Sequence, residues 1–410
     1  MRFVTIDSET FRAFAEKSPY RSFMQTPEIA KYRESNGWTT YYLGVEEAGE
    51  IKAASMLVAK PTFLGKSTFL APGGPLLDFE DRPLAAFFLK HLKSYVKSHN
   101  GYVLHIDPYY ELVERGRDGE KIIGGFDHTS VQKTLASQGF KPCSQSGQPK
   151  YLFTLDLNGQ TADQIFSDMK RNTRGHIRKA EKQGVKIREL KREELDVFKK
   201  ITESTSTRRN FEDKPQSYYE QMYDLFHEKG EVKFLLAEVK EQSEVSIPKH
   251  LRGTDSHFDN SRGRVAGTEI PGRVRPTCCK NDDREPSTLR NATSDCLTPL
   301  AAAMFILYGS EVIYLFSGSD EKYMKEYNAQ YLIQWHMIKY AIDHQFKRYN
   351  FYGINGLPDK SSKDYGIYDF KKGFTSDKTG RVVELIGAHE VAISPFFYHL
   401  HQILSGLKKH

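Results

Sequence analysis

The sequence predicts an α/β (α+β) protein built from two successive units, each a mixed sheet with flanking helices. Strand and helix signals alternate along both halves of the chain, and each half contains an apolar antiparallel strand pair. The 410 residues suffice for two domains of ordinary size. A hydrophobic content of 39%, with 12% aromatic residues, is typical of a folded chain. The formal net charge of +6 permits a polyanionic partner without requiring one.

The first half is predicted to form a hairpin, a helix and a strand in succession. Residues 39–61 (TTYYLGVEEAGEIKAASMLVAKP) show apolar alternation on both sides of a Gly-containing turn, which predicts two antiparallel strands. Residues 83–99 carry apolar side chains at helical spacing and follow DFEDR, a typical helix start. The next strand, GYVLHIDP, is expected to end at Pro108.

The second half repeats this alternation. A helix is predicted over 161–184, between a Thr cap and a terminal Gly. Its predicted buried stripe comprises Phe166, Met169, Thr173, Ile177 and Ala180. The elements expected after it are strand 185–190, helix 192–209, strand 232–239, hairpin 301–319, helix 331–345 and strand 348–354. Aromatic alternation in YGIYDFKKGF (365–374) then predicts a half-buried strand, with Lys371 and Lys372 on opposite faces.

Residues 243–297 interrupt the pattern. They contain four prolines and show neither the helical nor the strand period, so we expect an irregular insert. The strand before it and the hairpin after it are expected to be neighbours in one sheet. The abrupt change of composition between intact elements also fits a local frameshift, and translation of the other reading frames tests that reading.

The sequence favours a soluble, cytoplasmic protein without a metal site. The start of the chain is polar and lacks the apolar core of a signal peptide. The longest apolar run, 300–308, is far shorter than the roughly 20 residues of a membrane span. The four cysteines, Cys143, Cys278, Cys279 and Cys296, fit no metal-ligand spacing and are typical of a reduced chain. We expect His105 and His336 to be packing residues.

Eight collinear motifs together resemble the Fem family, the non-ribosomal peptidyltransferases that build the interpeptide bridge of bacterial peptidoglycan. They are SPYRSFMQTPEIAKYRESNGW, GGPLLDF, YVLHIDPYY, KRNTRGHIRKAEKQGVKIREL, YLFSGSDEKY, AQYLIQWHMIKYAI, RYNFYGINGL and YGIYDFKKGF. The likeness covers roughly residues 1–240 and 298–400. Many family members carry a coiled-coil arm where this chain has the insert, and four prolines without heptads rule out a coiled coil there.

The resemblance implies two tandem domains related to the GCN5-type (GNAT-like) acetyltransferases. The first would span 1–153, with 388–410 as a candidate completion, and the second 154–242 together with 298–387. The family moves an amino acid from aminoacyl-tRNA to the side-chain amine of a stem peptide or growing bridge. The implied partners are aminoacyl-tRNA, a lipid-linked or UDP-linked muropeptide precursor and, transiently, the inner membrane face. No cofactor and no metal are implied, and a convincing acetyl-CoA pyrophosphate loop is lacking.

The matching motifs also imply catalytic residues. The transferred acyl carbon becomes an oxyanion, and a fixed cation beside it contributes about 2.7–4 kcal/mol by analogy with an oxyanion-hole donor. Lys371 is assigned to stabilise the oxyanion or ester, and Phe370 is the wall that orients it. Asp107 matches an aspartate of the peptide-binding cleft, where it accepts the amine proton or holds the amine by charge. The alternatives without a catalytic role are that Lys371 faces solvent and that Asp107 only forms a turn.

Substrate contacts are implied at five further positions. Arg33 and Lys214 match basic residues that meet the precursor diphosphate. Some relatives have arginine at the second position, and the lysine here is expected to weaken bidentate phosphate binding. Tyr102 lines the peptide cleft, and Tyr218 is the aromatic residue that follows Lys214. Phe316 stands where some relatives have tyrosine, so any contact through that hydroxyl is lost.

The segment 170–192 contains ten basic residues. On a helix, Arg171, Arg174, Arg178 and Lys182 are expected on the wetted faces, where they suit tRNA phosphates or are merely solvated. Two other functions remain open: an acyl-CoA-dependent or protein N-terminal acyltransferase on the same fold, and a non-catalytic tRNA-binding protein. The sequence does not select among glycine, alanine and serine as the transferred amino acid.

Overall fold

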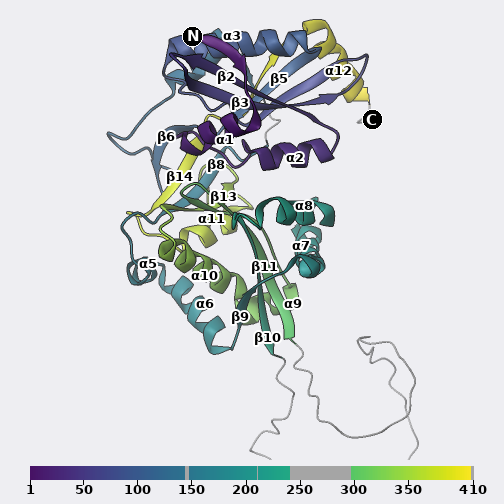
Figure 1. The fold of residues 1–410 in the computed structure, drawn as a ribbon. Helices are drawn as coiled ribbons and strands as arrows, with labels where there is room; N and C mark the ends of the chain where they lie inside the picture. Colours follow the sequence, from purple (N-terminus) through teal and green to yellow (C-terminus); the bar gives the residue numbers. More distant parts are fainter. Residues whose placement is uncertain (144–146, 210, 241–296, 408–410) are drawn as a thin grey trace, which may run out of the picture. The chain divides into compact units, whose positions relative to one another are not determined.

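Two mixed β-sheets organise the chain, in a computed structural model that describes residues 1–143, 147–209, 211–240 and 297–407 (Figure 1). Met1–Val239 and Pro299–His410 belong to one compact unit, which is the subject below. The insert expected at 243–297 lies outside the described residues, except for Leu297. No helix in the described part of the chain is both long and apolar enough to cross a bilayer.

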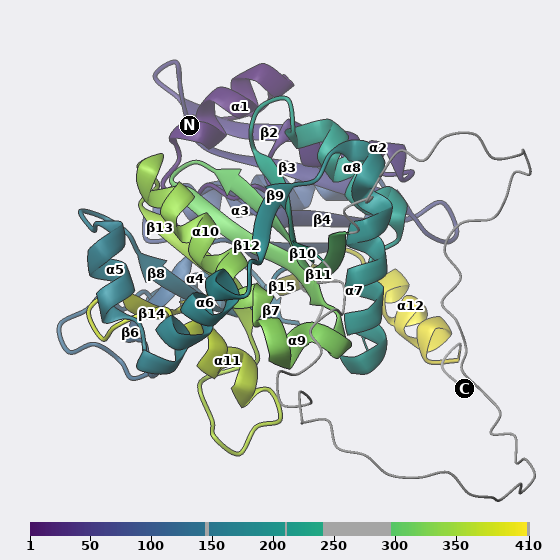
Figure 2. The ribbon, with the colours of Figure 1, turned by 90° about the horizontal axis from the view of Figure 1, so that it is seen from below.

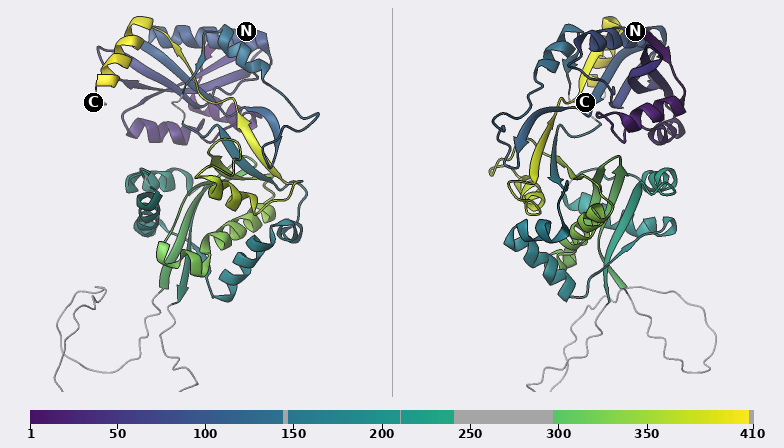
Figure 3. Two further views of the ribbon diagram at one scale, coloured as in Figure 1. Left: turned by 180° about the vertical axis from the view of Figure 1, so that it is seen from behind. Right: turned by 60° about the vertical axis from the view of Figure 1, so that its left-hand side comes forward.

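The first sheet has seven strands in the order β1-β2-β3-β4-β5-β15-β7. Their bounds are Arg2–Thr5, Thr39–Glu47, Glu50–Pro61, Ser67–Gly73, Gly101–Pro108, His389–Ala392 and Lys141–Pro142. The predicted β2–β3 hairpin is confirmed, and only β4 and β5 pair in parallel. Strand β15 and helix α12 (Pro395–Leu407), drawn in yellow, return from the end of the chain to run beside β5 (Figure 3).

The second sheet has eight strands in the order β6-β14-β8-β13-β12-β11-β10-β9. Their bounds are Glu111–Gly116, Gly380–Leu385, Tyr151–Asp156, Arg348–Ile354, Glu311–Ser319, Leu297–Tyr308, Val232–Lys240 and Lys186–Glu189. Strands β10 and β11 are neighbours, as the sequence predicts. Strands β12 and β13 run parallel, and the other registers described here are antiparallel. The α/β class with two mixed sheets is therefore confirmed.

Helices flank both sheets. The remaining ones are α1 (Ser8–Lys17), α2 (Pro27–Ser35), α3 (Arg82–Ser98), α4 (Ser130–Ser137), α5 (Ala162–Asp168), α6 (Arg171–Lys182), η1 (Arg192–Glu194), α7 (Leu195–Arg209), α8 (Gln216–Phe226), α9 (Glu321–Tyr327), α10 (Ala329–Asp343) and α11 (Tyr365–Lys372). Helix α3 packs on the first sheet around Phe88 and Leu92, both fully buried. Helices α6 and α10 lie side by side on the second sheet (Figure 2).

The single helix predicted over 161–184 is wrong, because the chain breaks into α5 and α6 at Met169 and Lys170. Both residues have extended backbone, with ψ of 151° and 142°. The Met169 side chain is buried, and the Lys170 amide donates to the Gly373 carbonyl at 2.9 Å. The predicted Thr161 cap is confirmed as part of a capping box with Gln164. The break therefore anchors the start of α6 beside the end of α11.

The strand predicted over 365–374 is also wrong, because residues 365–372 form helix α11. Tyr365, Tyr368 and Lys371 recur every three residues, and the last two are buried. That spacing places them on one helical face. Lys371 and Lys372 are consequently separated by about 100° of helical rotation instead of standing on opposite faces of a strand.

Candidate active site

Lys371 is buried in the last turn of α11, with 5% of its surface exposed. Its ammonium donates to the backbone carbonyls of Gly353, at 2.5 Å, and Tyr352, at 3.3 Å. Burial lowers the pKa of Lys371 to about 7. No carboxylate of the described residues forms an ion pair with it. Lys371 is thus a cation that the fold leaves without a counter-charge.

The two carbonyls come from an irregularity in strand β13. The pairing of β13 with β8 shifts register between Asn350 and Gly353, and Tyr352 there has a φ of +64°, a strained value for a residue with a side chain. The Asn350 side chain accepts a hydrogen bond from the Tyr352 amide at 2.8 Å. A Cβ on Gly353 would lie only 2.5 Å from Cγ of Pro149. The bulge therefore depends on Gly353 and aims two carbonyls at Lys371.

Lys371 lines a cavity of about 540 Å³, a size typical of ligand sites. Phe370 lines it too, and its ring centre lies 4.9 Å from that of Tyr331 on α10. On the same cavity, Tyr314 of β12 shares a hydrogen bond with Ser317, and burial raises the pKa of Tyr314 to about 12. The site therefore combines a buried ammonium with an aromatic wall.

Two arginines of this cavity are absent from the sequence-based site. Arg208 and Arg209 end helix α7, and both line the cavity. The Arg208 Nη1 atom is buried and has no hydrogen-bond partner among the described residues. The sequence signal was a pair of basic residues at a helix end, which by itself is typical of charge–dipole stabilisation. Only the fold brings that helix end to the cavity.

Four predicted substrate contacts gather in one cluster of cations and aromatic rings. The Arg33 guanidinium lies 5.3 Å from the Trp38 ring centre, and the exposed Lys214 ammonium lies 5.8 Å from that of Tyr218. The Tyr218 ring is edge-on to Phe316, with centres 5.6 Å apart.

Arg33 in this cluster resembles Lys371 in its electrostatics. Burial lowers the pKa of Arg33, and its Nε has no hydrogen-bond partner within the described part of the chain. The Tyr32 ring bridges Arg33 to Tyr218, with the Tyr32 and Tyr218 ring centres 5.4 Å apart. The cluster thus contains cations that can bind an anionic group of a ligand.

Asp107 and Tyr102 of strand β5 have separate surroundings. Asp107 is buried and accepts from the backbone amides of Gly147, at 2.8 Å, and Gln148, at 3.2 Å. The pKa of Tyr352 is raised mainly by burial and, to a smaller extent, by the charges of Tyr218 and Asp107. Asp107 therefore lies near the β13 bulge. Tyr102 is buried, accepts a hydrogen bond from Thr68 at 2.8 Å and is not among the described residues lining the Lys371 cavity.

The four basic residues predicted for tRNA differ in exposure. Arg171, Arg178 and Lys182 are exposed on α6. Arg174 is half-buried and donates to the Met169 carbonyl at 3.0 Å and to the Ser167 carbonyl, so it holds the α5–α6 break.

Helix α6 contacts the wall of the Lys371 cavity through His176, and the residue before the helix contacts α11. His176 lies 4.5 Å from Tyr331, measured between ring centres. Lys170, which precedes α6, pairs with Asp369 of α11 at 2.6 Å. Helix α6 is therefore next to the candidate site, although the exposed residues Arg171, Arg178 and Lys182 lie about 140° around the helix from His176.

The comparisons with known proteins agree on one family. The model of the family described as the FemAB family matches residues 6–406. The chain is 29% identical over 434 residues to "Aminoacyltransferase FemA" of Staphylococcus aureus (strain MRSA252), covering 100% of this chain and 99% of that protein. It is 28% identical, with the same coverage, to the protein of that name from strain N315. The solved structure titled "Crystal structure of FemX" matches with a TM-score of 0.73 at 19% identity, over 98% of this chain and 99% of the other.

Proposed function

The chain belongs to the FemAB family, and on that premise we propose that it moves an amino acid from aminoacyl-tRNA onto the side-chain amine of a peptidoglycan precursor or growing interpeptide bridge. The similarity to proteins named aminoacyltransferase over the full chain supports this reaction. The donor amino acid is glycine, alanine or serine, and the acceptor is a lipid-linked or UDP-linked muropeptide. The reaction takes place in the cytoplasm, next to the inner membrane face when the acceptor is lipid-linked.

The observation that carries the mechanism is the ammonium of Lys371, buried at a cavity that no carboxylate of the described residues lines. The acceptor amine attacks the ester carbonyl carbon, and the carbonyl oxygen becomes an oxyanion. Collapse then breaks the bond to the ribose oxygen, which takes up a proton as the amine loses one. A negative charge within about 4–6 Å favours the protonated lysine, so the oxyanion raises the pKa of Lys371 from about 7 and gains an ion pair as it forms.

The cation and aromatic cluster is proposed to hold the acceptor. Arg33 has an unpartnered Nε among the described residues and Lys214 is exposed, so both can meet the diphosphate. Tyr218 and Phe316 support these cations and give the acceptor an apolar wall. Phe316 cannot contribute a hydroxyl.

Two residues of β5 are proposed to shape the acceptor site. Asp107 orients the backbone of 147–148, through which it positions the incoming peptide. Its carboxylate already accepts from two backbone amides and from the Gln148 side chain, which supports a binding role over that of a general base. Tyr102 contributes packing to the peptide cleft.

Helix α6 is proposed to receive the donor tRNA. Arg171, Arg178 and Lys182 are exposed and suit backbone phosphates. Because His176 of α6 contacts Tyr331, a tRNA on the exposed face of this helix is separated from the wall of the Lys371 cavity by the width of the helix. Arg208, at that cavity, is proposed to bind a phosphate near the aminoacylated end.

The test compares two neighbouring lysines in transfer assays with charged tRNA and a muropeptide precursor. Lys371→Met is expected to lower kcat about 10²–10³-fold, the cost of an oxyanion-hole donor, with little change in the precursor KM. Lys372→Met is the matched control, because Lys372 pairs with Asp118 instead of facing the cavity. Equal losses of kcat in both variants contradict the assignment.

A ribonuclease control separates the alternative functions. Transfer that survives ribonuclease and requires acyl-CoA indicates an acyl-CoA donor on the same fold. Tight tRNA binding without transfer indicates a non-catalytic tRNA-binding protein. A panel of tRNAs charged with glycine, alanine and serine identifies the transferred residue.

A further inference from the structure

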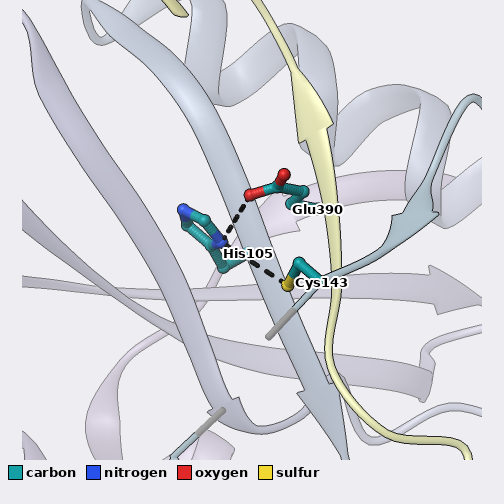
Figure 4. A group of neighbouring side chains, drawn as sticks. All are labelled: His105, Cys143 and Glu390. Carbon is teal, nitrogen blue, oxygen red and sulfur yellow. Dashed lines mark hydrogen bonds and ion pairs between the residues drawn. The ribbon is translucent and has the colours of Figure 1, made fainter. Parts of the chain in front are cut away.

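Three potential metal ligands meet on one face of the first sheet, outside the lining of the Lys371 cavity. They are His105 of β5, Cys143 directly after β7, and Glu390 of β15 (Figure 4). One ligand atom from each lies within 4.8 Å of the other two. His105 is buried, and the other two side chains are half-buried. Among the described residues, this is the group of His, Cys, Asp or Glu side chains close enough together to hold a metal ion.

Strand register explains why these residues meet. Glu390 stands directly opposite His105 on one side and Lys141 on the other, in antiparallel pairings. Cys143 is two residues beyond Lys141 and therefore points to the same face. The Cys143 amide donates to the Ala388 carbonyl at 3.0 Å, which ties this segment to β15. The backbone alone thus fixes the three side chains side by side.

The geometry fits a metal ion better than a proton relay. Nδ1 of His105 lies 3.3 Å from Oε2 of Glu390 and 4.0 Å from Sγ of Cys143. A Cys–His–Glu relay needs the thiol and the carboxylate on different ring nitrogens, whereas here both face Nδ1. Tetrahedral zinc with bonds of about 2.1 Å to N or O and about 2.3 Å to S separates N from O by about 3.4 Å and N from S by about 3.6 Å. The two distances are close to these values.

A fourth residue, Tyr398, forms a hydrogen bond with the carboxylate of Glu390. The Tyr398 hydroxyl of α12 donates to Oε1 of Glu390 at 2.5 Å, which leaves Oε2 directed toward His105. Hydrogen bonds to the outer atom of a ligand are the usual way in which proteins orient metal sites.

We propose that His105, Cys143 and Glu390 form a binding site for one divalent transition-metal ion, with zinc favoured by the mixed nitrogen, sulfur and oxygen ligands. Three protein ligands leave a fourth position for water. The ion joins β5, β7 and β15, so it fastens the C-terminal strand to the first sheet. The sequence predicts no metal site because the three ligands are 38 and 247 residues apart along the chain.

The decisive experiment is cobalt binding to the full-length chain after treatment with a chelator. We expect one equivalent of Co²⁺ to bind with visible bands of tetrahedral intensity and a near-ultraviolet thiolate-to-cobalt band. Cys143→Ser is expected to abolish the thiolate band. The matched control replaces the other three cysteines, Cys278, Cys279 and Cys296, by serine and is expected to keep it.

Further variants test the remaining ligands by the same titration. His105→Gln and Glu390→Gln are expected to weaken binding by more than 100-fold, and Tyr398→Phe by about 10-fold. Saturating Zn²⁺ is expected to raise the melting temperature of the unmodified chain but not that of Cys143→Ser. Absence of stoichiometric binding to the unmodified chain, or a thiolate band that disappears with the other three cysteines, overturns the proposal. The unmodified chain alone decides the question if a variant fails to fold.

Discussion

Two cations at opposite ends of strand β13 have opposite electrostatic surroundings. Arg348, at its start, faces a cavity of about 640 Å³ and donates to Glu111 at 2.7 Å and Glu311 at 3.3 Å. Burial would lower the pKa of Arg348, but the two carboxylates outweigh it and raise that pKa. Lys371, at the other end, donates to two backbone carbonyls and to no carboxylate in the described part of the chain, and burial lowers its pKa to about 7.

The difference distinguishes a structural cation from a reactive one. The Arg348 network is complete: Tyr109 donates to Glu311 at 3.0 Å and accepts from Asn350 at 3.1 Å. A new anion gains little from a cation that is already neutralised. Lys371 is held in a destabilised state, so an anion arriving at its cavity releases energy. Pairing with carboxylates therefore separates the two roles.

The largest expected effect on stability is a gain from Lys371→Met. The pKa of this lysine is about 7 in the folded chain, against an ordinary value of 10.5 for a solvated lysine. At about 1.4 kcal/mol per pKa unit, holding the ammonium buried costs at most about 5 kcal/mol below pH 7. The loss of hydrogen bonds to two carbonyls offsets part of this, so we expect the free energy of unfolding at pH 6 to rise by about 1–3 kcal/mol.

The pH dependence of that gain follows from proton linkage. Between pH 7 and pH 10.5 the unfolded chain binds more protons at Lys371 than the folded chain, so the unmodified chain becomes more stable as pH rises. The advantage of Lys371→Met therefore shrinks across this window. Urea unfolding of both chains at pH 6 and pH 9 measures it. A larger advantage at pH 9 than at pH 6 contradicts the assigned pKa direction.

Arg348→Met is expected to change stability in the opposite direction. It leaves Glu111 and Glu311 without their cation, and burial already raises the pKa of Glu311. Because Arg348 is only half-buried, the expected loss is about 1–3 kcal/mol. Urea unfolding at pH 7 measures it, with Lys347→Met as the neighbouring control. A stabilised Arg348→Met variant removes the contrast between the two cations.

The sequence predicts most of this fold but little of the site geometry. Both hairpins, helix α3 and the adjacency of β10 and β11 follow from periodicity and turn residues. Helix α11 differs from the predicted strand because, over ten residues, Tyr368 and Phe370 fit the strand period while Tyr365, Tyr368 and Lys371 fit the helical one. Short apolar stretches are ambiguous in this way, and packing on β13 decides between them.

The site itself is assembled from segments far apart in the chain. The resemblance to a family singled out Lys371, yet nothing local marks Arg208 as lining the same cavity, more than 160 positions earlier. The bulge that supplies the carbonyls depends on the fit of Gly353 against Pro149, which is a tertiary contact. Local patterns carry no information on such contacts.

Arg33→Ala extends the comparison to a third cation, which also lacks a carboxylate among its described contacts. If Arg33 binds the acceptor diphosphate in both the ground state and the transition state, its loss raises the precursor KM about 10-fold and leaves kcat nearly unchanged. Lys31→Ala is the matched control, because Lys31 is exposed on the same helix. Initial-rate kinetics over a range of precursor concentrations measures the effect. A fall in kcat without a change in KM excludes uniform binding by Arg33.

The smallest effects are expected on helix α6, where the comparison separates exposed cations from one that is engaged. Alanine at Arg178 or Lys182 is expected to reduce the slope of log affinity for tRNA against log salt by about 1 each, because each removes one phosphate contact. Arg174→Ala is expected to lower the melting temperature instead, since Arg174 donates to the Met169 carbonyl at the α5–α6 break. Filter binding at several salt concentrations, together with thermal unfolding, resolves the two classes. An unchanged slope in the Arg178 and Lys182 variants shows that this face is merely solvated, which leaves Arg208 at the cavity as the first cation to test for tRNA binding.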